Sequence, residues 1–193
     1  MKKVITTLVC LLIMGSIMAQ DEHLSFKGVP INGTVRKYTA AMKRKGFRSE
    51  GTKSKETAFL TGEFAGYSNC IVKVSTAKKR NVVNQIAVLM PDKDNWHALI
   101  EDYENLKSLL IDKYGAPAHV VEKYGNYKGD DNESKMHALH DRVIEWYTVF
   151  NTNLGDIKLE LVSGTFKSKG RVQMTYKDAA NSQTLKQKAL NDL

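Results

Sequence analysis

Cysteine is scarce in this sequence: there are two in 193 residues, and one of them, Cys10, lies in an apolar N-terminal run. Beyond that run Cys70 is the remaining cysteine, so the rest of the chain can form no intramolecular disulfide. Small exported domains that lack a sufficient core usually depend on such cross-links. We therefore expect a fold that is held together by its own hydrophobic core, which is feasible at about 170 residues.

Long apolar runs and strong compositional bias are also missing. No later stretch approaches the roughly 20 apolar residues that a membrane-spanning helix needs, so we expect no transmembrane segment there. Hydrophobic residues make up 42% of the chain and charged residues 26%. These fractions are close to ordinary globular usage, which excludes the disordered and fibrous classes.

Familiar catalytic motifs are missing as well. The sequence contains no glycine-rich phosphate loop, no His-Glu-x-x-His and no paired-cysteine motif. Residues 66–70 come nearest to the Gly-x-Ser-x-Gly elbow of hydrolases, but Cys70 stands in place of the final glycine. We expect a non-catalytic protein without a cofactor. The alternative is an enzyme whose site is assembled from dispersed polar residues.

The first 19 residues have the layout of a secretory signal peptide. Lys2 and Lys3 precede the apolar run of residues 4–13, and small residues lead to Ala19. We predict cleavage after Ala19 and a periplasmic or secreted location for residues 20–193. Val9 stands where a lipobox would have a small residue, so we do not expect a lipid on Cys10.

Apolar periodicity predicts helices and strands in the remainder. Two helices, one opening at Thr34 and one near Pro91, carry apolar stripes at helical spacing, and the second is expected to be the central core helix. Residues 48–56 are predicted to be a loop and residues 125–141 a polar insertion. Strands are predicted at residues 57–63, 69–75, 82–90, 143–151, 156–162 and 171–177, with a short amphipathic helix at 181–193.

These segments predict a single α+β domain over residues 20–193. It consists of two tandem units, 26–91 and 92–178, each a helix and a three-stranded antiparallel meander, with the helices packed on one face of the sheet. An offset of 86 residues aligns Phe64 with Phe150, Ile71 with Ile157 and Val88 with Met174. Both an internal duplication and a chance match of strand patterns explain this alignment.

Three segments carry a family resemblance: residues 26–34, the helix ending at residues 45–47, and residues 109–117. In them the chain resembles a group of uncharacterised exported α+β proteins of gut Gram-negative anaerobes, which implies no activity. The helix-plus-meander repeat also resembles, in topology, the outer-membrane assembly lipoprotein BamE and the beta-lactamase inhibitor protein. The chain lacks the lipid anchor of the former and the paired cysteines of the latter, so neither function carries over.

A few side chains are candidates for chemistry. Cys70 alternates with apolar residues, which favours a buried core thiol over a nucleophile. His137 and His140 stand three apart near acidic residues, so a metal site on a helical turn is an alternative to a solvated insertion. Trp146 and Tyr147 point to opposite faces of one strand, and we take Trp146 as a candidate ligand contact.

Basic residues are the most prominent remaining feature, with a formal net charge of +8. They attract anions, so we predict an exported binding or interaction module whose partner is an anionic lipid, lipopolysaccharide or an acidic protein. Nucleic acid is not expected, because the chain is exported and lacks an aromatic-basic binding motif. A solvated face that aids solubility is the alternative. The candidate ligand-binding residues are Arg36, Arg44, Lys45, Lys79, Arg80 and Trp146.

Overall fold

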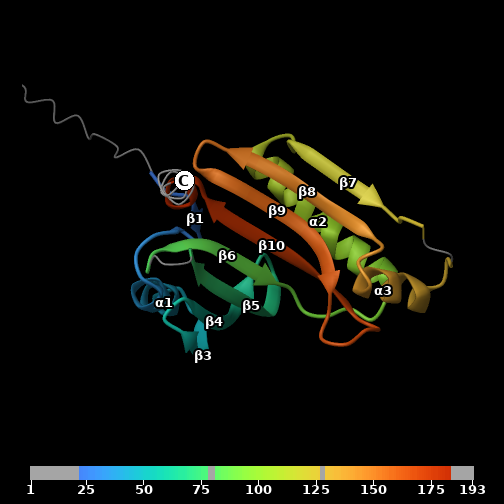
Figure 1. The fold of residues 1–193 in the computed structure, drawn as a ribbon, viewed down its shortest axis with the longest axis horizontal. Coiled ribbons are helices and arrows are strands. Elements are labelled where there is room, and N and C mark those ends of the chain that lie inside the picture. Colours follow the sequence, from blue (N-terminus) through green and yellow to red (C-terminus); the bar gives the residue numbers. More distant parts are fainter. Residues whose placement is uncertain (1–21, 78–80, 127–128, 184–193) are drawn as a thin grey trace, which may run out of the picture.

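The computed structural model describes residues 22–77, 81–126 and 129–183, and it shows an eight-stranded antiparallel sheet with a separate two-stranded hairpin (Figure 1). The strand order of the large sheet is β3-β4-β5-β6-β10-β9-β8-β7. The predicted α+β class is therefore confirmed. The elements are β1 (Ser25–Phe26), β2 (Val29–Pro30), α1 (Val35–Arg44), β3 (Arg48–Ser54), β4 (Thr57–Phe64), β5 (Tyr67–Thr76), β6 (Val83–Leu89), α2 (Trp96–Tyr114), β7 (His119–Lys123), α3 (Asn132–His140), β8 (Glu145–Thr152), β9 (Gly155–Ser163) and β10 (Gly170–Asp178).

Helices α1 and α2 are each followed by four strands, one more than the three that we predicted. β3–β6 follow α1, β7–β10 follow α2, and β6 pairs with β10 at the centre of the sheet. The additional strands are the two edge strands, β3 and β7. β3 is polar and falls in the predicted loop, while β7 is only 5 residues long. Edge strands pair on one side, and natural proteins keep them short or polar, so hydrophobic alternation does not reveal them.

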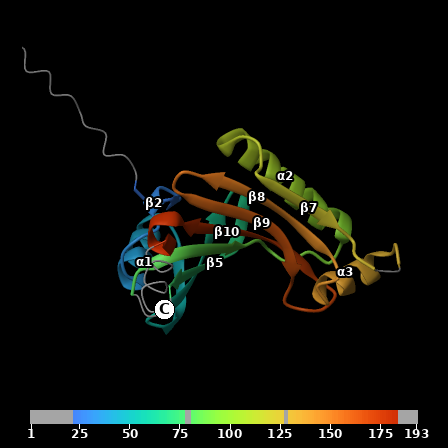
Figure 2. The ribbon, with the colours of Figure 1, turned by 45° about the horizontal axis from the view of Figure 1, so that its top comes forward.

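One face of the sheet, the inner face, forms the hydrophobic core. Helix α1 packs on β4 and β5 and α2 on β8–β10, and Figure 2 shows α2 lying along one side of its half of the sheet. Neighbouring strands place buried side chains side by side across this face. One such row, in which no residue is more than 2% exposed, is Leu60, Val72, Val88, Met174, Leu159 and Thr148.

The other face, the outer face, carries side chains that are partly open to solvent. The adjacent row of register partners on that face is half-buried: Thr61, Ile71, Leu89, Gln173, Glu160 and Tyr147. This contrast between adjacent rows is the period-2 alternation of a sheet with one covered face.

Helix α2 is the central core helix that its apolar stripe predicts. Trp96, Leu99, Tyr103, Leu106 and Leu110 are all buried, which confirms the stripe. The helix begins with a side-chain cap and ends where a glycine takes a positive φ of 82°, a conformation that side chains with a Cβ adopt at a cost. The Tyr103 hydroxyl pairs with the buried Thr148 hydroxyl, which fixes α2 on β8.

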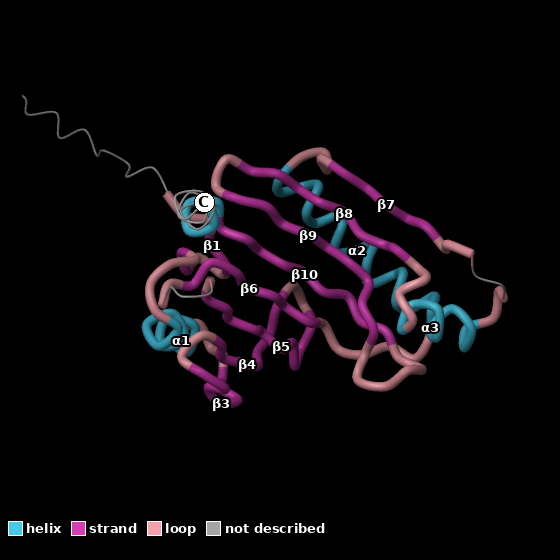
Figure 3. The backbone as a smooth tube through the Cα atoms, in the orientation of Figure 1, coloured by secondary structure: helices cyan, strands magenta, loops and turns pink. Residues whose placement is uncertain are grey.

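The predicted polar insertion contains a packed helix, α3. Met136 and Leu139 are buried against β9 and β10, so residues 125–141 are not simply a solvated insertion. A Cβ on Gly170 would lie 2.5 Å from Leu99 and 2.9 Å from Leu139, so this glycine lets α2 and α3 approach β10 closely. The sequence conceals α3 because two buried apolar residues three positions apart are a weak pattern among charged neighbours. Figure 3 shows α3 beside the end of the sheet where β10 begins.

A buried carboxylate joins the two ends of the described chain. Asp178, which is 0% exposed, accepts hydrogen bonds from the backbone of Leu24 and Asn181, both at 2.8 Å. Its Oδ2 also lies 3.1 Å from His23 Nδ1. The Asn181 amide in turn donates to the carbonyl oxygens of Ile31 and Val83, both at 3.0 Å. These contacts attach the segment before α1 to the last strand.

Two predictions fall partly or wholly outside the described residues. The signal peptide at 1–19 lies outside them, and of the C-terminal helix predicted at 181–193 only residues 181–183 are described, in a helical stretch that begins at residue 179. Within the described ranges, no helix has the length and apolarity to cross a membrane.

Candidate functional site

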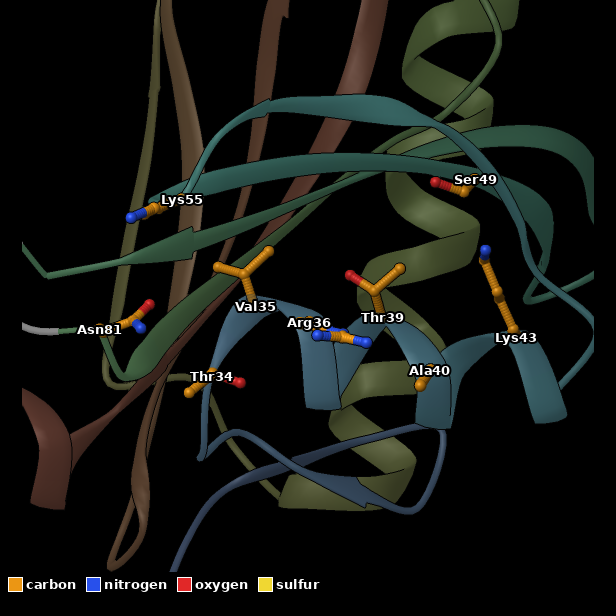
Figure 4. Close-up of a pocket in the computed structure, with 9 residues that line it drawn as sticks. All are labelled: Thr34, Val35, Arg36, Thr39, Ala40, Lys43, Ser49, Lys55 and Asn81. Atoms are coloured by element: carbon orange, nitrogen blue, oxygen red, sulfur yellow. The ribbon is translucent and has the colours of Figure 1, made fainter.

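A cavity of about 630 Å³ lies between α1 and β3, and we call it the α1 cleft (Figure 4). Figure 4 shows Val35, Thr39 and Lys43 extending from α1 toward the strands, with Lys43 and Lys55 at opposite ends of the space. Lys55 comes from the turn between β3 and β4. The described lining residues are Thr34, Val35, Arg36, Thr39, Ala40, Lys43, Ser49, Lys55 and Asn81.

Helical spacing explains why α1 presents one side to the cleft. Thr39, Ala40 and Lys43 follow Arg36 at three, four and seven positions, so the four residues share a side of the helix next to the buried stripe. The stripe itself, which includes Tyr38 and Met42, faces the core. The cleft is therefore lined by Val35 of the stripe and by residues that border the stripe on its β3 side.

The electrostatics of the α1 cleft favour an anion. Arg36, Lys43 and Lys55 line it, and no acidic residue is among its described lining residues. Within the described part of the chain, none of these three cations forms an ion pair. The N-terminus of α1 also borders the cleft, its first turn has no acidic residue, and a helix N-terminus carries partial positive charge.

One polar group in the α1 cleft lacks a partner. The Thr39 side chain is 9% exposed, and its hydroxyl has no hydrogen-bond partner among the described residues. Leaving a buried hydroxyl unpaired costs about 1–3 kcal/mol. An oxygen of a bound ligand would accept a hydrogen bond from this hydroxyl and remove that cost.

The structure separates the basic residues that we predicted as one surface. Arg36 lines the α1 cleft, whereas Arg44 and Lys45 are exposed at the end of α1 and do not line it. Lys79 and Arg80 lie outside the described residues. Lys43 and Lys55 belong to the basic cluster of the sequence but, like Thr39, are not among the predicted binding residues. The spacing of Arg36 and Lys43 was the available signal for Lys43, because seven positions are close to two helical turns.

A second cavity, of about 570 Å³, lies on the outer face beside the C-terminal end of α3. Trp146 lines it, as do Tyr147 and the ion pair of Lys158 with Glu160, whose atoms lie 2.6 Å apart. Trp146 also packs against Trp96, with ring centroids 6.1 Å apart. The predicted ligand contact Trp146 thus belongs to a different cavity from Arg36, and part of its ring serves the core.

Cys70 is a buried core thiol. It is 0% exposed, and its sulfur lies 3.6 Å from the sulfur of Met90. Burial raises the pKa of the Cys70 thiol to about 11. Because the thiolate is the reactive form, a thiol with this pKa is a poor nucleophile near neutral pH. The structure confirms the burial that its apolar neighbours predict.

Cys70 should therefore resist thiol reagents in the folded protein. At pH 8 we expect negligible reaction with Ellman's reagent over an hour, followed by reaction of one thiol per chain of residues 20–193 after addition of urea. The absorbance of the thiolate that the reagent releases measures the reaction before and after urea is added. Rapid reaction of the folded protein would contradict the buried position and the raised pKa.

The two histidines of the proposed metal alternative do not converge on a shared site. His137 is exposed, and Nδ1 of His140 lies 2.8 Å from the hydroxyl of Ser163. Among the described residues, no group of three His, Cys, Asp or Glu side chains is arranged to hold a metal ion.

Charged residues near the start of α2 form pairs rather than a cavity lining. Asp102 lies 3.1 Å from Lys93 and accepts a hydrogen bond from the Tyr67 hydroxyl. Burial and the neighbouring Asp102 raise the pKa of Tyr67 to about 12. Asp92 pairs with Arg171 at 2.6 Å. Neither group lines the two cavities described above.

Comparisons with family models, curated proteins and solved structures find no match for this chain. The resemblances noted for the sequence therefore remain expectations, and the function has to be argued from the geometry of the α1 cleft.

Proposed function

We propose that this chain is an exported, non-catalytic binding module that holds an anionic group in the α1 cleft. One observation carries the proposal: three cationic side chains line a cavity that has no acid among its described lining residues. Cations gathered around a concave surface raise the local concentration of anions and speed their association. The signal-like pattern of residues 1–19 supports export, and export makes lipid phosphates, lipopolysaccharide or an acidic protein the relevant partners.

The proposed binding site is smaller than the basic surface that the sequence predicts. Arg36 remains in the binding site, and Lys43 and Lys55 join it. Arg44 and Lys45 lie outside the α1 cleft although they belong to the same charge cluster. These two residues therefore provide a matched control, because reversing them changes the net charge by as much as reversing Arg36 and Lys43.

Reversing the charges in the α1 cleft should remove anion binding. The probe is retention on vesicles of phosphatidylglycerol mixed with phosphatidylcholine. We expect Arg36→Glu with Lys43→Glu to abolish retention at low salt, while Arg44→Glu with Lys45→Glu retains most of it. Binding of the wild type should weaken steeply with added salt, because the screening length is only about 8 Å at physiological ionic strength.

The outcomes of this experiment separate the alternatives. Equal loss in both double variants would show that only the overall basic charge matters, which contradicts a specific cleft. Unchanged retention in both would leave the basic residues as a solubility feature and would overturn the proposal. Circular dichroism of each variant checks that the fold is intact.

A further inference from the structure

The size of the α1 cleft bears on what kind of anion it holds. Its volume of about 630 Å³ lies within the range of roughly 300–1,000 Å³ that is typical of sites for small organic ligands. An inorganic ion such as phosphate or sulfate fills only a small part of that space. The remainder would have to be filled by water or by another part of the ligand.

The lining of the α1 cleft has an apolar part and a cationic part. Val35 and Ala40 border the cleft along α1, together with the side chains of Thr34 and Thr39, which carry methyl groups. The two lysines stand toward its ends, with Lys43 at one and Lys55 at the other, and Arg36 lies between them on α1 (Figure 4). Lysine and arginine also bury apolar stems while their charged ends stay in water, so they extend the apolar surface. Such a lining suits a ligand that carries both an anionic group and an apolar body.

A donor for the anionic group is already present. The Thr39 hydroxyl is buried between the two lysine ends of the cleft, and no described residue is its hydrogen-bond partner. A hydrogen bond from a hydroxyl to an ionised oxygen is shorter and stronger than one between neutral groups. The hydroxyl thus provides a directional contact that the flexible cations alone do not.

We infer that the α1 cleft binds a small amphiphilic organic anion, whose oxyanion meets Thr39 and the flanking cations while its apolar body lies along Val35 and Ala40. The inference rests on the proposed function and specifies its ligand class. A single molecule enters the cleft, so binding requires neither a membrane surface nor a polyanion.

The fluorescent sulfonate 1-anilinonaphthalene-8-sulfonate is a suitable probe, because it combines one anionic group with an apolar body. N-phenyl-1-naphthylamine is its neutral counterpart. We expect the folded protein to bind the sulfonate about tenfold more tightly than the neutral dye, because the neutral dye forms no charge-assisted hydrogen bond. Arg36→Glu with Lys43→Glu should remove this preference, and Thr39→Val should weaken sulfonate binding about three- to tenfold.

The matched control is again Arg44→Glu with Lys45→Glu, which should change the affinity for the sulfonate less than about twofold because exposed charges contribute little. Competition then separates the ligand classes. Decyl sulfate below its micelle concentration should displace the dye, whereas inorganic sulfate at equal ionic strength should not.

Each contrary result has a distinct meaning. If inorganic sulfate displaces the dye as well as decyl sulfate does, the cleft is a simple anion site: the inference fails and the proposed function stands. If the dye does not bind, or if the cleft variants bind it as the wild type does, the inference also fails, and vesicle retention decides the proposed function. If both dyes bind equally and vesicle retention survives charge reversal in the cleft, both proposals fail.

Discussion

Replacing Asp178 with asparagine should lower the free energy of unfolding by about 2–4 kcal/mol, because a buried carboxylate that accepts several hydrogen bonds would lose part of them. The carboxylate accepts from the backbone of Leu24 and Asn181, and His23 Nδ1 lies against the same oxygen as Asn181. An amide can accept through its oxygen only. The NH₂ group of the asparagine would replace either Oδ1, which faces the Leu24 N–H, or Oδ2, which faces the Asn181 N–H. In either orientation a buried N–H would lose its acceptor.

The effect should concentrate where the two ends of the described part of the chain meet. Asp178 attaches the segment before α1 to the last strand. In the Asp178→Asn variant we therefore expect the amide hydrogens of Leu24 and Asn181 to exchange faster than in the wild type, with smaller increases at other sites. Urea denaturation followed by circular dichroism measures the free energy. Asp156→Asn is the control, since Asp156 is exposed on the neighbouring strand, opposite Lys177. Equal stability of the Asp178 variant and the control would mean that the carboxylate does not hold these segments.

The sequence predicts the interior elements of this fold better than its edges. The stripe that begins at Trp96 and includes Leu106 identifies α2, because many apolar residues repeat with the helical period. β3 has no such repeat, since an edge strand obtains its stability from hydrogen bonds to β4 and not from burial on a patterned face. Helix α3 is missed for a related reason, as its buried face is narrow.

The 86-residue offset matches equivalent positions in one pair of strands but not in another. It aligns Val88 with Met174, which are register partners and buried on the inner face. It also aligns Ile71 with Ile157, yet Ile71 belongs to the outer row with Leu89, while Ile157 is buried beside Tyr176 on the inner face. A shift of one residue exchanges the faces of a strand, so a single offset does not describe both strand pairs.

The sequence indicates that the candidate site is cationic, but it does not indicate which residues line it. The local excess of cationic residues pointed to α1, and Arg36 does line the α1 cleft. Arg44 and Lys45 also lie off the apolar stripe of α1, so the sequence does not distinguish them from Arg36. Which side of the helix meets β3 depends on the path of the chain after α1, and helical periodicity carries no information about that path. Lys55 lies across the space from α1, so its place in the cleft depends on the tertiary structure.

Alkaline pH should unfold this protein steeply. Four buried groups, Tyr38, Tyr103, Tyr176 and Cys70, have pKa values that burial raises above their ordinary values of 10.0 for tyrosine and 9.0 for cysteine. Above those ordinary values the unfolded chain releases protons that the folded chain retains. Since the folded state then binds more protons, the free energy of unfolding falls as pH rises. The contribution of these groups is complete below about pH 9 and is lost progressively above it.

The slope of the free energy of unfolding against pH provides a quantitative test. Each buried tyrosine should remove about 1.4 kcal/mol per pH unit above pH 10, until its own folded-state pKa is reached. Urea midpoints between pH 8 and 11.5 give the slope, and tyrosinate absorbance should rise together with unfolding. Tyr38→Phe is the informative variant, because the Tyr38 hydroxyl is buried without a described partner and its loss breaks no described hydrogen bond. We expect this variant to be at least as stable as the wild type at pH 8 and to lose stability less steeply above pH 10, by the contribution of one tyrosine. An unchanged slope would show that Tyr38 releases its proton in the folded state, which is incompatible with a side chain that is only 2% exposed.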